Sequence, residues 1–187
     1  MRHQLAALAL VAGVAGPAQA LVLDYPGTFN AADYGDVAGL LDVTHTLATQ
    51  HWATGYDDLV GVAWGGSQTG GETASVRLAS VNGALVTLQG FDLGIWSSGR
   101  GVPETVNVYE IGNAVALDTF TISENNNQHW SFEIGRSSAS GFVIAWTSPW
   151  WVAIDNIDVS VSAVPEPATG ALMLLGALGL AAATRRR

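Results

Sequence analysis

The sequence predicts an all-β protein, an antiparallel jelly-roll-like β-sandwich flanked by an N-terminal signal-peptide helix and a single C-terminal transmembrane helix. Three observations support this prediction. Apolar residues in the middle of the chain recur with a period of two, which is typical of half-buried strands. Residues that favour turns separate these runs. A sustained apolar pattern suited to a helix occurs only in the two terminal segments.

The first element is the segment 1–20. A positive charge at Arg2 precedes an apolar run over 5–15, Gly16-Pro17 ends that run, and Ala18-Gln19-Ala20 supplies small residues before a cleavage point. This order is typical of a secretory signal peptide. We therefore expect export by the Sec machinery, with cleavage after Ala20.

The segment 21–163 is long enough for one domain with its own core. The whole chain has a net charge of -9, but this segment holds three arginines, no lysine and 15 acidic residues, a net charge of -12. Such a surface repels phosphate backbones, so nucleic acid is not expected as a partner. The chain has no cysteine, which excludes disulfides, a thiol nucleophile and a thiolate metal site.

Strand signals follow in order along the domain. Alternation begins at 41–47 and continues at 106–108, 130–134 and 142–146. Asn82-Gly83 separates the runs 73–81 and 84–91, and Gly112-Asn113 separates 106–111 from 114–121. Asn and Gly accept positive φ at low cost, so both dipeptides predict hairpins. Glu124-Asn125-Asn126-Asn127 marks a further turn before the strand at Trp130.

The C-terminal segment 164–187 has three parts. Pro165-Glu166-Pro167 should stay extended and accessible, because proline fixes φ and removes an amide donor. The uncharged run 168–184 would span roughly 25 Å as a helix, just enough to cross a bilayer. Arg185, Arg186 and Arg187 then predict a cytoplasmic end, which places the domain outside the inner membrane.

This order of motif, helix and arginine cluster resembles the PEP-CTERM sorting signal of Gram-negative bacteria. The resemblance implies that the tail holds an exported protein at the inner membrane until an exosortase, a membrane-embedded cysteine transpeptidase-like enzyme, processes it near the motif. Pro165, Glu166 and Pro167 would then be recognition residues. An ordinary tail anchor is the alternative, since positive flanks are common.

The domain itself resembles a β-sandwich often found in front of PEP-CTERM tails. The resemblance rests on Val86-Thr-Leu-Gln-Gly-Phe-Asp-Leu-Gly94, Val106-Asn-Val-Tyr to Leu117, Gly55-Tyr-Asp-Asp-Leu59 and Trp151-Val-Ala-Ile-Asp-Asn-Ile157. It implies a fold akin to galactose-binding-like carbohydrate modules. Ala153 stands where that family usually has glycine.

The last strand, 152–160, carries the most informative polar residues. Period two places Ile154 and Asn156 on one face, and Asp155 with Ile157 on the other, among apolar positions. A buried carboxylate needs a partner. Asp155 could be held by backbone amides, or it could bind a structural Ca²⁺ together with Asn156 and, as the resemblance implies, Asp24.

The seven tryptophans provide the candidate ligand-binding residues. Trp150 and Trp151 are adjacent, so at most one of them should be in the core, and Trp96 lies near Arg100 in a glycine-rich stretch. Exposed aromatic side chains stack on sugar rings, whereas packing in the core is the alternative role. We therefore expect Trp150, Trp151, Trp96 and Arg100 to form a sugar-binding surface.

Motifs of the common hydrolases and zinc sites are missing from the sequence. We expect a non-enzymatic protein of the cell surface or extracellular matrix that binds exopolysaccharide and needs no cofactor beyond the Ca²⁺ considered above. One alternative is a purely structural surface protein without a discrete ligand. The least favoured is a glycan hydrolase, since paired carboxylates are recognised only by their separation in space.

Overall fold

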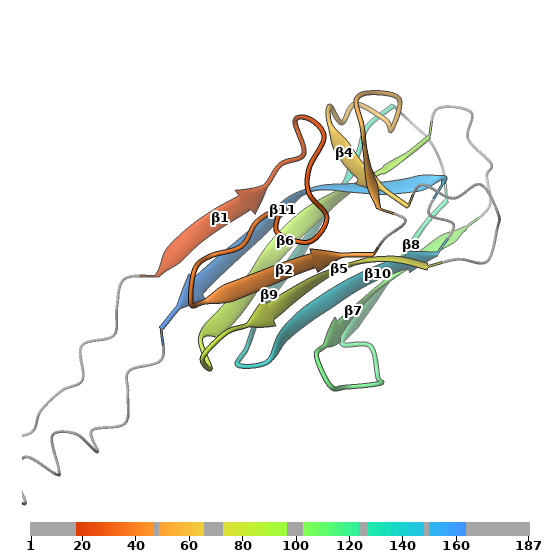
Figure 1. Ribbon diagram of the computed structural model, residues 1–187. Helices are drawn as coiled ribbons and strands as arrows, with labels where there is room; N and C mark the ends of the chain where they lie inside the picture. The colour runs from red at the N-terminus through yellow and green to blue at the C-terminus, as the bar shows by residue number, and fades with distance from the viewer. Residues whose placement is uncertain are drawn as a thin grey trace, which may run out of the picture. The chain divides into compact units, whose positions relative to one another are not determined.

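The computed structural model describes residues 18–46, 49–65, 73–96, 103–123, 127–147 and 150–163. Every regular element in these ranges is a β-strand (Figure 1). No helix long and apolar enough to cross a membrane is found among them. The predicted transmembrane helix 168–184 and the signal peptide up to residue 17 lie outside the described residues.

Within the described ranges, eleven strands form two antiparallel sheets. Sheet A contains β1 (Gln19–Leu23), β3 (Gln50–Trp52), β4 (Val62–Trp64), β6 (Leu85–Ile95), β9 (Trp130–Ser138) and β11 (Val152–Ser162). Sheet B contains β2 (Leu41–His45), β5 (Thr73–Ser80), β7 (Glu104–Glu110), β8 (Asp118–Ile122) and β10 (Gly141–Thr147). The all-β prediction is confirmed for the described part of the chain.

The strand order places β11 at the centre of sheet A. β11 pairs with β6 on one side, and on the other side with β4 near its start and β1 near its end. β9 and β3 are the outermost strands. The order in sheet B is β2-β5-β10-β7-β8.

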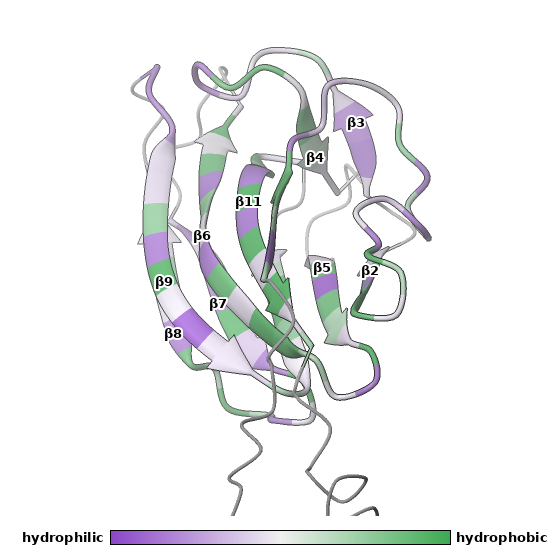
Figure 2. Cartoon of the chain, turned by 90° about the vertical axis from the view of Figure 1, so that its left-hand side faces the viewer, coloured by the Kyte–Doolittle hydropathy of each residue, from purple (hydrophilic) through white to green (hydrophobic). Residues whose placement is uncertain are grey.

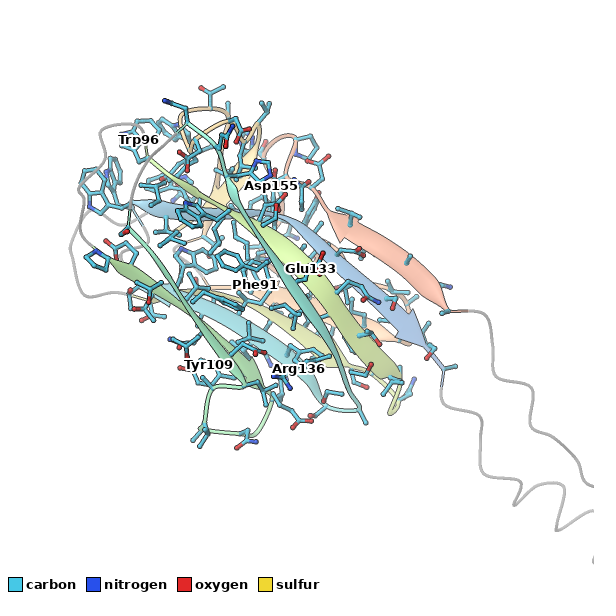
Figure 3. All side chains as sticks on the ribbon, turned by 180° about the vertical axis from the view of Figure 1, so that it is seen from behind. Phe91, Trp96, Tyr109, Glu133, Arg136 and Asp155 are labelled. Atoms are coloured by element: carbon cyan, nitrogen blue, oxygen red, sulfur yellow. The ribbon has the colours of Figure 1, made fainter. Side chains whose placement is uncertain are left out.

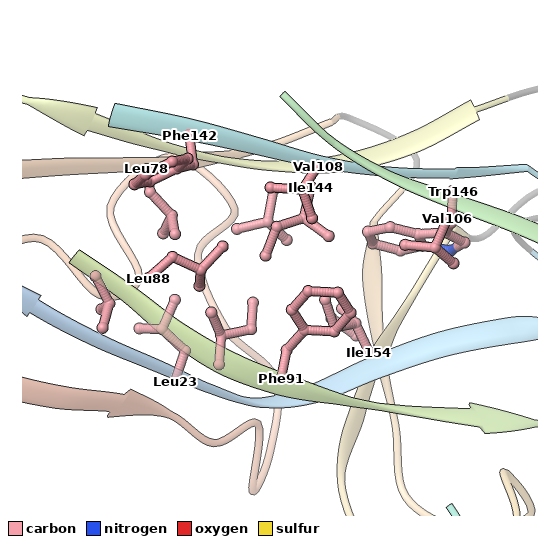
Figure 4. Close-up of a cluster of buried hydrophobic side chains, with 14 of the residues drawn as sticks. Leu23, Leu78, Leu88, Phe91, Val106, Val108, Phe142, Ile144, Trp146 and Ile154 are labelled. Carbon is pink, nitrogen blue, oxygen red and sulfur yellow. The ribbon is translucent and has the colours of Figure 1, made fainter. Parts of the chain in front are cut away.

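The main hydrophobic core fills the space between the two sheets (Figure 4). Leu88, Phe91 and Ile154 of sheet A face Ile144 and Trp146 of sheet B, and each of these side chains is at most 2% exposed. The Trp146 Nε1–H donates to the Val152 carbonyl oxygen at 3.0 Å. The largest core side chain therefore has its polar atom satisfied, and this bond joins the two sheets.

Alternating hydropathy is visible along β6, β9 and β11 (Figure 2). In β2 the pattern is regular, since Leu41, Val43 and His45 are buried and the residues between them are half-buried. The runs that predicted strands at 41, 106, 130 and 142 are all strands. The strands β1, β3 and β4 were not predicted, because β3 and β4 have only three residues each and β1 begins within the predicted signal peptide.

The Asn82-Gly83 turn is present, but the predicted hairpin is wrong. Asn82 and Gly83 have φ values of 53° and 71°, and the Ala84 N–H donates to the Val81 carbonyl oxygen at 3.0 Å. The flanking strands β5 and β6 nevertheless belong to different sheets. Turn chemistry fixes the local reversal of the chain but not which strand pairs with which. The hairpin predicted at Gly112-Asn113 is confirmed, because β7 pairs with β8.

Side-chain contacts join the sheets at both sides of the sandwich. Arg136 of β9 forms an ion pair with Asp118 of β8, with Nε 2.7 Å from Oδ2. On the other side, the Tyr25 hydroxyl lies 2.9 Å from Nε2 of His45. Tyr25 lies two residues after the end of β1 and is fully buried. The first contact joins strands of different sheets, and the second joins the segment after β1 to β2 of sheet B.

Strand β1 begins at Gln19, two residues before the cleavage point expected after Ala20. Gln19 is opposite Val161, and Ala20 is opposite Ser160. Cleavage at that point would leave Leu21–Leu23 paired with β11. The cleavage position stays a prediction, and the mature N-terminus would lie beside the end of β11, which precedes the C-terminal segment.

Candidate ligand-binding face of the sandwich

Five aromatic side chains gather on the outer face of sheet A, the face turned away from sheet B. Together with Ala153, Val62 and Leu59 most of them form a second apolar cluster, separate from the main core. We call the five the aromatic cluster. It consists of Trp52 from β3, Tyr56 from the loop after it, Trp64 from β4, Trp96 just after β6 and Trp150 just before β11.

Strand pairing brings these five residues together from distant parts of the chain. Ala153 of β11 lies between Trp64 of β4 and Gly94 of β6. Gly94 allows the loop after β3 to lie directly on the sheet, because a Cβ at this position would be 2.6 Å from the Tyr56 carbonyl oxygen. The Trp96 N–H donates to the Trp151 carbonyl oxygen at 2.9 Å, which holds the ends of β6 and β11 together.

The rings form a continuous series of edge-to-face contacts. Ring centroids are 4.9 Å apart for Trp150 and Trp64, 5.7 Å for Trp64 and Trp52, 5.6 Å for Trp52 and Trp96, and 5.2 Å for Trp96 and Tyr56. A pocket of about 70 Å³ lies among them. Trp52 is 41% exposed, so the cluster has both an enclosed part and an exposed aromatic surface.

Two polar atoms of the cluster are buried. The Tyr56 hydroxyl donates to the Trp150 carbonyl oxygen at 2.7 Å, and burial raises the pKa of Tyr56, so this hydroxyl stays protonated. The Trp64 Nε1–H has no hydrogen-bond acceptor among the described residues. Trp64 is 6% exposed, so water does not readily replace the missing acceptor.

A second depression, of about 440 Å³, lies over β6, β9 and β11. Asp92 is opposite Ser131 of β9 and Asp155 of β11, whereas the neighbouring Phe91 and Leu93 belong to the core. This alternation places Asp92 on the outer face. We call the depression the polar groove. Its polar lining residues are Gln89, Asp92, Ser131, Glu133, Asn156 and Asp158.

The loop after β3 connects the aromatic cluster to the polar groove. Its Asp58 accepts hydrogen bonds from the backbone N–H of His129 at 2.7 Å and from His129 Nδ1 at 2.8 Å. The bond to Asp58 raises the pKa of His129, and the nearby Asp92 carboxylate acts in the same direction. His129 Nε2 lies 3.8 Å from Asp92 Oδ2, so this histidine joins the loop to the groove.

Asp155 lies at a β-bulge. Asp155 is opposite Asp92 and Asp158 is opposite Gly90, so β11 has one extra residue relative to β6. Asn156, within this step, has a φ of 50°. Period two predicted Ile154 and Ile157 on opposite faces, which is wrong. Both are fully buried in the main core, because the bulge reverses the alternation.

Asp155 is 3% exposed, and backbone amides hold its carboxyl group. The Tyr25 N–H donates to its Oδ1 at 3.4 Å. Burial raises the pKa of Asp155 to about 6. Hydrogen bonds from the backbone of Asn156 and Tyr25 oppose this rise, whereas the carboxylates of Asp24 and Asp92 contribute to it.

These contacts match the first of the two alternatives for Asp155, a carboxyl group held by amides. The other two residues proposed as Ca²⁺ ligands have different contacts. The Asn156 amide donates to Asp92 Oδ2 at 2.8 Å, and Asp24 is exposed and accepts the Tyr34 hydroxyl through its backbone oxygen. Within the described ranges, no group of three or more acidic, histidine or cysteine side chains is placed to hold a metal. The Ca²⁺ site stays a prediction.

The structure brings together two of the four predicted sugar-binding residues. Trp96 and Trp150 both line the aromatic pocket, whereas Trp151 is half-buried and does not line it. Arg100 lies outside the described residues. Figure 3 shows Trp96 and Asp155 in the upper part of the view, with Tyr109 and Arg136 in the lower part.

Sequence reasoning missed Tyr56 and the polar groove. Tyr56 is in the short motif Gly55-Tyr-Asp-Asp, whose glycine has a φ of 101°. This motif could have indicated a structured loop. The groove residues Gln89 and Glu133 come from strands far apart in the sequence, and no local spacing links them.

Comparison with known families gives one match. Residues 163–187 match the PEP-CTERM protein-sorting motif, which includes Pro165, Glu166, Pro167 and the three terminal arginines. A search of curated proteins gives no match. The motif indicates an exported surface protein that is sorted by an exosortase, with transit through a membrane-anchored form before cleavage.

Proposed function

We propose that this protein binds exopolysaccharide at the cell surface or in the extracellular matrix, through the aromatic cluster on sheet A. The observation that carries the proposal is the series of five aromatic rings, whose central member Trp52 is 41% exposed. Sugar rings present apolar C–H faces, which stack on aromatic side chains. The cluster therefore supplies the kind of surface that a neutral or weakly charged glycan requires.

The polar groove supports the same proposal. Sugar hydroxyls donate and accept hydrogen bonds, and Gln89, Ser131 and Asn156 offer amide and hydroxyl groups on the same face. Asp92, Glu133 and Asp158 add acceptors. We infer that further sugar units of a bound chain lie in this groove, beyond the loop that carries Asp58.

The architecture fits this use. Consecutive strands cross repeatedly between the two sheets, for example β5 to β6 and β9 to β10. We infer from this that the sandwich is a jelly roll similar to galactose-binding-like modules. Fold alone does not assign a ligand, so the proposal depends on the aromatic cluster.

The sorting signal gives the route to the surface. We propose that the Sec machinery exports the chain and that 168–184 holds it in the inner membrane, with Arg185 to Arg187 in the cytoplasm and the domain in the periplasm. An exosortase then cleaves near Pro165-Glu166-Pro167 and passes the domain to the cell surface or matrix. The match at 163–187 supports this proposal.

We propose binding without hydrolysis. Asp92 in the groove accepts a hydrogen bond from the Asn156 amide at 2.8 Å and lies near His129. Both contacts engage Asp92 Oδ2 within the protein, whereas a glycosidase uses a pair of carboxyl groups that face the scissile bond. Incubation with the polysaccharide should release no new reducing ends, and their release would identify a hydrolase.

The binding proposal is tested with the processed protein and the exopolysaccharide of its own host. We expect retention on the immobilised polymer, and Trp52→Ala should weaken binding about 5- to 30-fold, the value of one stacking contact. Tyr109→Ala is the matched control, because Tyr109 is a half-buried aromatic residue on sheet B. A wild-type protein that binds none of its host's polysaccharides would instead support a purely structural role.

A further inference from the structure

The aromatic pocket offers a ligand aromatic rings but no hydrogen bonds. Among the described residues its lining consists of the aromatic cluster alone, and the surface exposed to the pocket is almost entirely apolar. The Tyr56 hydroxyl already donates to the Trp150 carbonyl oxygen, and the Trp64 Nε1 is itself buried. A hydroxyl group, a carbonyl oxygen or an N–H that entered the pocket would therefore lose its hydrogen bonds to water without replacement.

The size of the pocket also limits the group that can enter it. An apolar cavity of about 150 Å³ holds benzene, which has six heavy atoms. The pocket here has a volume of about 70 Å³ and thus suits a group of about three heavy atoms. A whole sugar ring is too large, whereas a methyl group and the atom that carries it fit.

Trp52 connects the pocket to the exposed surface of sheet A. Its side chain lines the pocket, yet Trp52 is 41% exposed. It lies between Trp64 and Trp96 in the series of rings, with centroids 5.7 Å and 5.6 Å away. A sugar ring that stacks on the exposed part of Trp52 therefore lies next to the pocket, and one of its substituents can enter.

Few substituents of a sugar suit such a lining. The hydroxyl and hydroxymethyl groups of an ordinary hexose carry oxygen atoms that need hydrogen bonds. Anionic substituents meet an acidic loop, since Asp57 and Asp58 follow Tyr56 directly. A methyl group has no polar atom to desolvate, and its transfer from water to the aromatic rings is favourable. The pocket is therefore selective for methyl groups.

We propose that the aromatic pocket binds the methyl group of a 6-deoxy or methylated sugar unit. The methyl group packs among the rings of Trp64, Trp96 and Trp150, while the sugar ring stays outside on Trp52. This inference rests on the proposed function, because it names the kind of exopolysaccharide that the same cluster recognises. A sugar carries such a group either as C6 of a 6-deoxyhexose or as a methyl ether, and the pocket chemistry is common to the two.

Pairs of free sugars test the inference on the processed, exported protein, with tryptophan fluorescence as the measure of binding. L-Rhamnose and L-mannose differ only at C6, as do L-fucose and L-galactose, whereas 3-O-methyl-D-glucose and D-glucose differ only in a methyl ether. In at least one pair, the methyl-bearing sugar should bind about tenfold more tightly, because its partner can only place a hydroxyl group in the pocket without a hydrogen bond. The pair that shows the difference identifies the source of the methyl group.

Two substitutions relate this preference to the pocket. Trp150→Ala removes one wall and lets water reach a bound hydroxyl group, so the preference for the methyl-bearing sugar should fall to about twofold or less. Trp151→Ala is the matched control, because Trp151 is the adjacent tryptophan, is half-buried and does not line the pocket. The control should keep the full preference.

Saturation-transfer NMR on the wild-type protein decides the question even where Trp150→Ala does not fold. Irradiation of the aromatic protons of the protein should saturate the methyl protons of the bound sugar more strongly than its ring protons. Equal saturation of the two kinds of proton would overturn the inference.

The remaining outcomes separate this inference from the proposed function. Equal binding within all three pairs, or no binding of these sugars, would overturn the inference, while retention on the host's polysaccharide would still support the proposed function. Binding of tetramethylammonium without any preference within the pairs would overturn the inference and identify an ammonium site instead. Failure to bind both these sugars and the host's polysaccharide would overturn both proposals.

Discussion

Asp155 and Asp92 lie directly opposite each other on β11 and β6, so two carboxyl groups share one cross-strand position on the outer face of sheet A. Asp155 is buried and Asp92 opens onto the polar groove. Burial, aided by the nearby carboxylates, raises the pKa of Asp155 to about 6. Near neutral pH the folded protein therefore holds an ionised carboxylate whose charge is less favourable there than in water.

Replacement of Asp155 by Asn should stabilise the domain at high pH. The pKa of Asp155 is about 6 in the folded state, compared with an ordinary value of 3.8 for an aspartate in water. The folded state therefore binds a proton at Asp155 more tightly than the unfolded state does. The stability that this provides is fully present below about pH 4 and is lost as the pH rises through 6. Asp155→Asn should match the wild type near pH 4 and exceed it by up to about 3 kcal/mol at pH 8. Urea unfolding at both pH values measures the difference.

The control for this experiment is Asp42→Asn. Asp42 lies on β2 and pairs with Arg77 at 3.5 Å, with both side chains more than 40% exposed. Loss of an exposed pair changes stability little. A loss of stability in Asp155→Asn at pH 8 would show that the ionised carboxylate is needed there, as a bound cation would require.

Chelation tests the Ca²⁺ alternative directly. We expect EDTA to leave the melting temperature of the exported domain unchanged, because Asp155 is held by backbone amides and Asn156 donates to Asp92. A bound Ca²⁺ would stabilise the fold by about 2 to 3 kcal/mol at concentrations well above Kd. A melting temperature that falls with EDTA and recovers with Ca²⁺ would contradict this expectation and support a Ca²⁺ site at Asp155.

The strands of this fold could be predicted from the sequence better than their partners. Alternation in β2, β7, β9 and β10 is local and depends on one half-buried face for each strand. The assignment of β5 and β6 to different sheets is not local, and Asn82-Gly83 looks the same in a hairpin and in a crossing between sheets. The bulge at Asn156 also could not be detected from the sequence, because the apolar residues on either side of it are consistent with uninterrupted alternation.

The protonation of His129 should depend on Asp58. The hydrogen bond to Asp58 is the main cause of the raised pKa of His129, and the folded state therefore gains stability from the charged imidazole at low pH and loses it as the pH rises through that pKa. Asp58→Asn should lower the pKa of His129 in an NMR titration. Asp33→Asn, in the loop after β1, should leave it unchanged, and an unaltered His129 pKa in Asp58→Asn would contradict the contact.

The aromatic cluster was only partly accessible to sequence reasoning. Trp150 was expected at a binding surface because it is adjacent to Trp151, and Trp96 because it lies near Arg100 in a glycine-rich stretch. The structure brings Trp96 and Trp150 together. Their common pocket depends on β4, a strand of three residues that pairs with β11. A strand of three residues is too short to show alternating hydropathy. The position of Trp64 beside Trp150 therefore depends on the pairing of β4 with β11.

Gly94 should be required for the shape of the cluster. A Cβ at this position would lie 2.6 Å from the Tyr56 carbonyl oxygen, so Gly94→Ala must displace the loop that carries Tyr56. We expect a loss of about 1 to 3 kcal/mol in the free energy of unfolding, together with weaker glycan binding. Gly27→Ala is the matched control, because no atom lies within 4 Å of its Cβ position. Unchanged stability and binding in Gly94→Ala would mean that the loop does not pack on the sheet in this way.

The three residues Pro165, Glu166 and Pro167 should be needed for release from the membrane. They lie three to five residues after Ser162, the end of β11, and within the segment that matches the sorting motif. Their replacement by alanines leaves the apolar run 168–184 and the terminal arginines intact, so the anchor persists while the recognition motif is lost. In a host with an exosortase, we expect full-length protein to accumulate in the inner-membrane fraction, as seen by immunoblotting, whereas Ser162→Ala should be processed normally. Release of the triple variant at the wild-type rate would show that processing does not depend on this motif.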